Sequence, residues 1–161
     1  MLEQKYSSTL NSPLGTLTII STDTAVIEIT FGVTELIELS NSLSELAKHQ
    51  LELYFEGKLK TFDFPFLQRG TEFQQQVWSN LLNIPYGTTT SYAAFSSHHP
   101  KAIRAIASAN GKNNLAIVVP CHRVIGSSGK LVGYAGGLHR KQWLLEHEQK
   151  ISQVGQTRID F

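Results

Sequence analysis

Cysteine occurs only once in this chain of 161 residues, at Cys121, and that excludes whole classes of fold. One thiol cannot form an intramolecular disulfide or build a zinc site from several cysteines. The chain therefore has to be stabilised by a hydrophobic core, for which its 41% apolar and 17% charged residues are suitable. A lone thiol is most often a small buried apolar group, so a chemical role for Cys121 has to be indicated by its neighbours.

Charge is divided unevenly along the chain. Residues 1–70 contain five Lys and Arg against nine acidic residues, a net charge of −4, whereas residues 71–150 contain eight against three, a net charge of +5. A basic second half favours contact with a polyanion such as nucleic acid. The sequence has no apolar run long enough for a membrane span and no signal-peptide pattern. It therefore predicts a cytoplasmic protein, or a nuclear one if the source is eukaryotic.

The first half of the chain predicts a small β-sheet with one helix. Apolar and β-branched runs within residues 6–31 are typical of strands, and leucines at helical spacing predict a helix over residues 34–56. Phe62, Phe64 and Phe66 alternate as in a short strand, which Pro65 restricts to a sheet edge. Gln68-Arg69-Gly70 is the best boundary, so we expect two domains, residues 1–69 and 70–161.

The second half predicts a mostly helical domain. Thr71 caps an amphipathic helix, and two short helices, one starting at Ser91 and one over about 101–110, predict a helix-turn-helix. The apolar run 116–119 predicts a buried strand that leads to Cys121, and residues 138–148 predict a last amphipathic helix. The predicted fold class is therefore α+β.

The residues beside Cys121 favour a reactive thiol. His122 and Arg123 follow it directly, and neighbouring His or Arg can give a cysteine thiolate character. A carboxylate that orients His122 and raises its basicity would complete the arrangement, and Glu146 and Glu148 are the candidates. This set of residues alone also fits a cysteine hydrolase.

Several longer motifs occur in one order along most of the chain. They are Ser12-Pro13-Leu14-Gly15, Tyr54-Phe55-Glu56-Gly57, Ile84-Pro85-Tyr86-Gly87, Thr90-Ser91-Tyr92, Lys101-Ala102-Ile103-Arg104-Ala105, Pro120-Cys121-His122-Arg123-Val124, Gly133-Tyr134-Ala135-Gly136-Gly137 and Trp143-Leu144-Leu145-Glu146-His147-Glu148. Together they resemble the O6-alkylguanine-DNA alkyltransferases, also called methylated-DNA–protein-cysteine methyltransferases. The resemblance implies a ribonuclease H-like N-terminal domain and a winged-helix-like C-terminal domain.

The resemblance also implies site residues. Those in catalytic positions are Cys121 as the alkyl acceptor, His122 as its base through a water, Glu148 as the partner of His122, Asn113 as a brace of the active-site turn and Tyr92 as a residue that crowds the DNA backbone and hydrogen-bonds the flipped guanine. Those expected to contact DNA are Ser91, Tyr92, Arg104, Ala105 and Arg123, with Arg104 filling the gap left by the flipped base. Those expected around the base are Tyr134, Val124, Ala135 and Gly136.

The implied function is DNA repair in one stoichiometric, self-inactivating step. An alkyl group, such as methyl, would move from O6-alkylguanine to Cys121, with O4-alkylthymine as a further candidate substrate. No metal and no organic cofactor would be needed. The partner would be double-stranded DNA, bound by a monomer through phosphates and the minor groove, because the small residues around Ala105 suit a narrow groove.

Three other functions remain open at this point. The first is a non-enzymatic protein that binds alkyl lesions, although relatives of that type lack the acceptor cysteine that is present here as Cys121. The second is a cysteine hydrolase that uses Cys121 and His122, which would need an oxyanion hole that the sequence does not identify. The third is a DNA-binding regulator.

Overall fold

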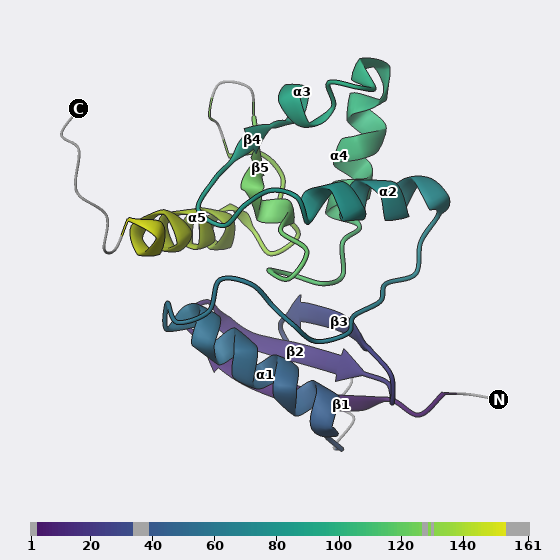
Figure 1. Ribbon diagram of the computed structural model, residues 1–161, viewed down its shortest axis with the longest axis vertical. Coiled ribbons are helices and arrows are strands. Elements are labelled where there is room, and N and C mark those ends of the chain that lie inside the picture. Colours follow the sequence, from purple (N-terminus) through teal and green to yellow (C-terminus); the bar gives the residue numbers. More distant parts are fainter. Residues whose placement is uncertain (1–2, 34–38, 127–128, 130, 154–161) are drawn as a thin grey trace.

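The computed structural model describes residues 3–33, 39–126, 129 and 131–153. Two layers are visible in Figure 1: a sheet with one helix below, and a group of helices above, joined by a single long connection. The α+β class predicted from the sequence is confirmed. The helix expected over residues 34–56 includes positions 34–38, which lie outside the described residues, and the two expected domains include the further positions 1–2, 127–128, 130 and 154–161.

The sheet is antiparallel, with strands β1 (Tyr6–Ser12), β2 (Gly15–Ser21) and β3 (Val26–Phe31) in sequence order. Helix α1 (Ser42–Phe55) packs against β1 and β2. Its first residue lies well after the predicted start at 34, because Asn41 caps the helix by accepting a hydrogen bond from the backbone of Ser44 at 2.8 Å.

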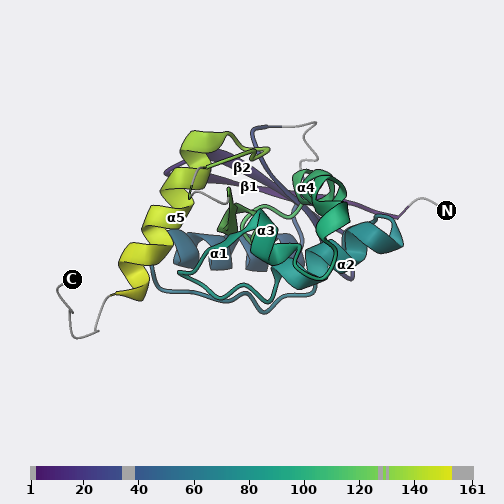
Figure 2. The same ribbon diagram turned by 90° about the horizontal axis from the view of Figure 1, so that it is seen from above.

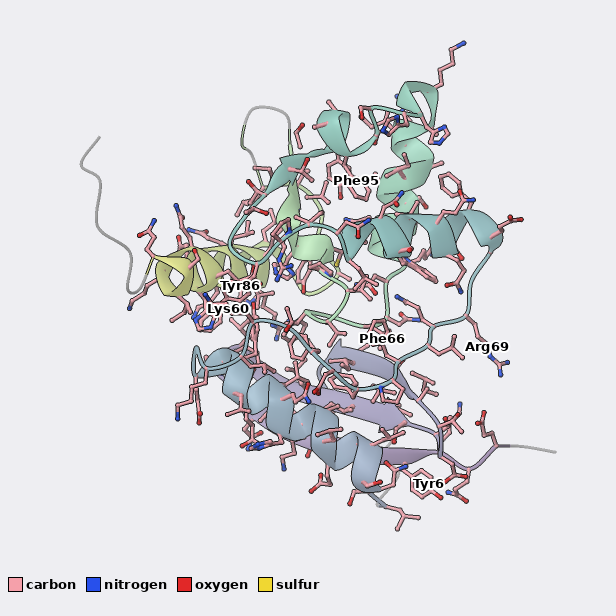
Figure 3. The ribbon with its side chains drawn as sticks, in the orientation of Figure 1. Tyr6, Lys60, Phe66, Arg69, Tyr86 and Phe95 are labelled. Atoms are coloured by element: carbon pink, nitrogen blue, oxygen red, sulfur yellow. The ribbon has the colours of Figure 1, made fainter. Side chains whose placement is uncertain are left out.

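Within the described residues no further strand pairs with β3, yet its outer edge is occupied. Val26 exchanges backbone hydrogen bonds of 2.9 Å with Pro65 and Leu67, and Ile29 exchanges bonds of 2.8 and 3.0 Å with Asn114 and Ala116. The strand predicted at 62–66 is therefore reduced to one bridge, since proline has no N–H to continue a ladder. Figure 3 shows Phe66 between the two layers. The segment at 114–116 ties the sheet to the second half.

The second half consists of short elements around a buried turn. In chain order they are α2 (Glu72–Leu81), β4 (Thr90–Ser91), α3 (Tyr92–Phe95), η1 (Pro100–Ala102), α4 (Ile103–Gly111), η2 (Cys121–Arg123), β5 (Val124–Ile125) and α5 (Leu138–Ser152). Strands β4 and β5 pair in parallel. Trp78 of α2 donates a 2.9 Å hydrogen bond to the carbonyl of Ala109 in α4. Figure 2 shows α5 along one side of the molecule, α2 and α4 on the other, and α3 between them.

The strand predicted at 116–119 is wrong, because these residues form a turn. Ile117 has a φ of 72°, a left-handed conformation that costs a β-branched residue roughly 1–3 kcal/mol. Backbone bonds from Val118 to Ala116 (2.8 Å) and from Val119 to Leu115 (3.0 Å) close the turn. The predicted burial is confirmed for Ile117, Val118 and Val119, so the apolar run reflects packing and not an extended backbone.

The buried apolar side chains form one continuous cluster that extends through both halves, from the sheet and α1 to α5. The two layers therefore share a core. None of the helices in the described part of the chain is long and apolar enough to cross a membrane.

Candidate active site

Cys121 is the first residue of the short helix η2 and lies directly after the strained turn. Its side chain is 7% exposed and lines a cavity of about 380 Å³. That volume is within the range of about 300–1,000 Å³ that is common for small-molecule sites. The only thiol of the protein therefore faces a space that can admit a ligand.

Asn113 holds the turn and touches the sulfur. Its Nδ2 donates to the carbonyl of Val119 at 2.8 Å and to Sγ of Cys121 at 3.3 Å. Its Oδ1 accepts from the backbone of Leu115 at 3.0 Å and from the side chain of Gln68 at 2.8 Å. Both ends of this amide are therefore used, and an N–H points at the sulfur.

His122 and Glu148 form a fully buried pair. Nε2 of His122 lies 2.7 Å from Oε2 of Glu148, and both side chains are at most 1% exposed. Hydrogen bonds from His122 and Arg123 outweigh the effect of burial and hold the pKa of Glu148 far below its usual value, so this carboxylate is ionised. Nε2 of His122 must then carry the proton of this bond.

The second ring nitrogen of His122 is left as an acceptor. Burial lowers the pKa of His122, so the ring is neutral, and its buried Nδ1 has no hydrogen-bond partner among the described residues. Burial raises the pKa of Cys121, while the hydrogen bond from Asn113 and the charge of Lys141 lower it. The resting state is therefore a thiol beside a neutral imidazole that can accept its proton.

The expectation that Arg123 contacts DNA is wrong. Its side chain is 7% exposed and its guanidinium is bound inside the protein, with bonds of 2.8 and 3.1 Å to Glu148 and of 2.7 Å to the carbonyl of Ile84. A fork of donors that is already paired with a buried carboxylate cannot reach a phosphate. Arg123 instead neutralises Glu148.

Lys141 is a second buried cation, and sequence reasoning missed it. Its side chain is fully buried, and its Nζ donates to the carbonyls of Val124 and Val132 at 2.7 Å and of Gly133 at 3.4 Å. Two of these carbonyls belong to residues that line the cavity. Lys141 therefore ties the cavity wall to α5 and places positive charge near Cys121.

The cavity contains only part of the predicted base pocket. Tyr134, Ala135 and Tyr92 line it together with Cys121, whereas Val124 and Gly136 do not. Val124 is fully buried and its carbonyl accepts a hydrogen bond from Lys141, and its expected place around the base stays a prediction. The position of Gly136 is also tightly packed, since an added Cβ would lie 2.8 Å from the Tyr134 ring.

The hydroxyl of Tyr92 is oriented toward donation. It accepts a 2.7 Å hydrogen bond from Asn110, whose amide also reaches the carbonyl of Cys121 at 3.4 Å. Its own proton is therefore free for a ligand in the cavity. Ser91, a predicted DNA contact, caps α3 by accepting from the backbone of Ala94 at 3.0 Å.

Arg104 lies in the first turn of α4, beside the cavity wall that Ala107 contributes. It is exposed and makes no side-chain hydrogen bond within the described part of the chain. Ala105, Ala107 and Ser108 are also exposed. This surface of α4 therefore consists of small side chains, with the long cationic side chain of Arg104 at its start. The described residues contain no group of three His, Cys, Asp or Glu that could hold a metal.

Three buried residues of the candidate site were not predicted from the sequence: Tyr54, Gln68 and Lys141. Tyr54 and Gln68 come from the first half, and no periodic pattern relates them to Cys121. Lys141 did carry a signal, because Lys141, Leu144 and Glu148 are spaced as one helical face and all three are buried. A charged residue on the apolar face of a helix indicates a side chain that is buried and paired.

Comparison with known proteins covers nearly all of the chain. The family model described as "6-O-methylguanine DNA methyltransferase, ribonuclease-like domain" matches residues 5–68, and the one described as "6-O-methylguanine DNA methyltransferase, DNA binding domain" matches residues 72–150.

Two curated relatives share the name "Methylated-DNA--protein-cysteine methyltransferase". The one from Mycobacterium bovis is 52% identical over 116 residues, which is 71% of this chain and 70% of that protein. The one from Mycolicibacterium paratuberculosis is 44% identical over 160 residues, which is 94% of this chain and 97% of that protein.

Two solved crystal structures are similar in fold to this chain. The crystal structure of Mycobacterium tuberculosis O6-methylguanine methyltransferase has a TM-score of 0.81 at 41% identity and covers 91% of this chain and 94% of its own. The crystal structure of Mycobacterium tuberculosis OGT in complex with DNA has a TM-score of 0.82 at 43% identity, with the same coverage.

Proposed function

Because the chain belongs to the 6-O-methylguanine DNA methyltransferase family, we propose that Cys121 is its alkyl acceptor and that His122 and Glu148 activate it. The protein is a DNA-binding methylated-DNA–protein-cysteine methyltransferase, which repairs DNA by alkyl transfer. One observation carries the assignment of residues. The sulfur of the only cysteine lines a cavity, and the buried Nδ1 of the adjacent histidine is an acceptor with no hydrogen-bond partner among the residues that the structure describes.

The reaction is a nucleophilic displacement at the alkyl carbon. The thiol proton of Cys121 moves to Nδ1 of His122 through a bridging water, and the resulting thiolate attacks the methyl carbon. The carbon–O6 bond breaks and its electron pair stays on the guanine, which takes up one proton. A thioether and an unmodified guanine result, so proton and charge balance without a cofactor.

The buried groups stabilise each stage of this transfer. As His122 gains a proton, the anionic Glu148 stabilises the imidazolium through the hydrogen bond in which Nε2 of His122 lies 2.7 Å from Oε2 of Glu148. The N–H of Asn113 stabilises the negative charge that develops on sulfur. The free proton of the Tyr92 hydroxyl is available to the guanine as it leaves. The thioether cannot be displaced by these groups, so each molecule acts once.

The small side chains on the exposed surface of α4 support binding in the minor groove of double-stranded DNA. Ala105, Ala107 and Ser108 are exposed there and would fit where bulky side chains would not. Arg104 would enter the stack in place of the flipped O6-alkylguanine, because it is long, exposed and next to the cavity. Phosphate contacts would supply most of the affinity.

The domain division, the oligomeric state and the cellular location of the protein are also part of the proposal. We assign residues 1–69 and 70–161 to two domains, supported by family models that match residues 5–68 and 72–150. We take the protein to act as a monomer in the cytoplasm. O4-alkylthymine remains a further candidate substrate.

The test is incubation of the protein with duplex DNA that contains one O6-methylguanine, followed by intact mass measurement. The expected product is protein heavier by one CH₂ unit, with peptide mapping to Cys121 and no more than one repaired base per molecule. Cys121→Ser, which is similar in volume, should gain no mass and still bind the DNA. Turnover beyond one base per molecule, or binding without mass gain as in a lesion-binding protein, would refute the assignment.

A further inference from the structure

Gln68, in the connection between the two halves, is 7% exposed and uses both ends of its amide. Its Nε2 donates to Oδ1 of Asn113 at 2.8 Å, and its Oε1 accepts from the backbone of Asn114 at 2.9 Å. Gln75 of α2 holds the backbone of Gln68 through a 2.6 Å bond to its carbonyl. The side chain of Gln68 is therefore fixed against the residue that faces the sulfur.

The orientation of the Asn113 amide matters because its two ends have opposite polarity. With Oδ1 toward Gln68 and Leu115, its Nδ2 faces the carbonyl of Val119 and Sγ of Cys121. A half-turn of the amide would bring Oδ1 against both of these acceptors. An oxygen in that place would repel a thiolate instead of stabilising it.

We propose that Gln68 is a positioning residue for the alkyl transfer: by donating to Oδ1 of Asn113, it keeps the Nδ2–H of Asn113 directed at the Cys121 sulfur. The inference rests on the proposed function of Cys121. It gives the first half of the chain a part in the chemistry, because Gln68 precedes the boundary between the domains.

Other groups also act on the thiol, and within the described part of the chain no hydrogen bond joins Gln68 to them. Lys141 lowers the pKa of Cys121 through its charge, and Tyr92 and Tyr134 line the same cavity as the sulfur. His122 follows Cys121 in the chain and is held by Glu148. A change at Gln68 therefore isolates the contribution of the Asn113 amide.

The experiment compares Gln68→Met with Gln76→Ala in the whole chain. Methionine is similar in length to glutamine but cannot donate to Asn113, whereas Gln76 is exposed on the same helix, α2, and makes no side-chain hydrogen bond within the described residues. Two quantities are measured: the pH midpoint of thiolate absorbance and the rate of methyl transfer against pH. The absorbance of Cys121→Ser is subtracted, and because the chain has one cysteine the difference belongs to Cys121 alone.

The expected result for Gln68→Met is a thiolate midpoint higher by about one pH unit, which corresponds to a lost hydrogen bond to a charged group. Transfer at neutral pH should slow by about tenfold and recover as the pH is raised, because the thiolate fraction is restored. Gln76→Ala should leave the midpoint unchanged. Gln68→Asn, which is too short to reach Asn113, should behave as Gln68→Met and serves if the latter does not fold.

An unchanged midpoint in folded Gln68→Met, with transfer slowed equally at every pH, would overturn the proposal and leave Gln68 a structural residue. Failure of the proposed function would look different. In that case the unmodified protein would gain no methyl group, while the thiolate midpoints would still report whether Gln68 acts on Cys121.

Discussion

The hydroxyl of Tyr54 in α1 donates a 2.6 Å hydrogen bond to Oε2 of Glu148 in α5, a partner 94 positions along the chain. The same oxygen accepts from His122 at 2.7 Å. Burial, followed by the nearby charge of Glu148, raises the pKa of Tyr54 well above its usual value, so the hydroxyl stays a donor. The first half of the chain thus contacts the carboxylate that holds the proposed base.

Tyr54→Phe should destabilise the protein by about 1–3 kcal/mol, because a buried charged acceptor loses one of its donors. The measurement is urea-induced unfolding at pH 7.5. Tyr86→Phe is the matched control: the Tyr86 ring lies 6.1 Å from that of Tyr54, but its hydroxyl has no partner among the described residues. Equal losses in both variants would contradict the role given to the Tyr54 bond.

Arg123→Ala should act on stability, not on DNA affinity. Removing this guanidinium leaves Glu148 buried with fewer donors, and breaking such a pair costs about 3–5 kcal/mol. Thermal unfolding measures the loss, and DNA binding is measured at a temperature where the variant is folded. A stable variant with weakened DNA binding would restore the DNA contact expected from the sequence.

Arg104→Ala should show the opposite behaviour. The side chain is exposed, so unfolding should change by less than about 0.5 kcal/mol. Methyl transfer from duplex DNA should slow by about tenfold or more, because the gap left by the flipped base is no longer filled. Transfer from single-stranded DNA provides the comparison and should be much less affected, since no gap has to be filled there. Equal slowing on both substrates would argue against this role.

Stability should fall as the pH is lowered from 7.5 to 5.5. Burial lowers the pKa of His122 in the folded protein. Near pH 6.5 the unfolded chain therefore binds a proton at His122 that the folded chain does not bind. This group can contribute at most about 1.4 kcal/mol per pH unit. His122→Gln keeps an N–H donor for Glu148 but does not titrate, and its unfolding free energy should decline less over that range. Parallel curves for the two proteins would show that His122 is not the group responsible.

Lys141→Met should raise the pKa of Cys121, because it removes a buried positive charge that favours the thiolate. It should also lower stability, since three carbonyls lose their donor. Thiolate absorbance against pH and thermal unfolding are the two measurements. Lys150→Met, at an exposed position of the same helix, should change neither. A rise in the pKa of Cys121 in both variants would indicate a general effect of net charge.

Sequence reasoning reached the elements and the centre of the site because both leave local signals. Helical spacing located α2 and α5, and the run from Cys121 to Arg123 marked the proposed nucleophile and its proposed base. It placed a strand at 116–119, because a buried turn and a buried strand have the same apolar composition. The chain reverses direction there because of the left-handed conformation of Ile117, and no sequence pattern predicts that conformation.

The misplaced role of Arg123 has a different origin. An arginine in a basic half of the chain suggests a DNA contact, and only the fold reveals that Glu148 lies within 2.8 Å of it. The same applies to Tyr54 and Gln68, whose partners are 94 and 45 positions away. Contacts of that range are set by the packing of the two layers and cannot be found from spacing.

The pairing of Ile29 with Asn114 and Ala116 has a consequence for attempts to dissect the molecule. A piece cut after residue 69 would keep β1 to β3, but the N–H and C=O of Ile29 would face solvent along a bare strand edge. Such an edge can recruit further copies, so that piece should aggregate during expression. The complementary piece would lose the sheet that anchors the segment before Cys121. Co-expression of both pieces, with each covering the other, offers the better route to a working split protein.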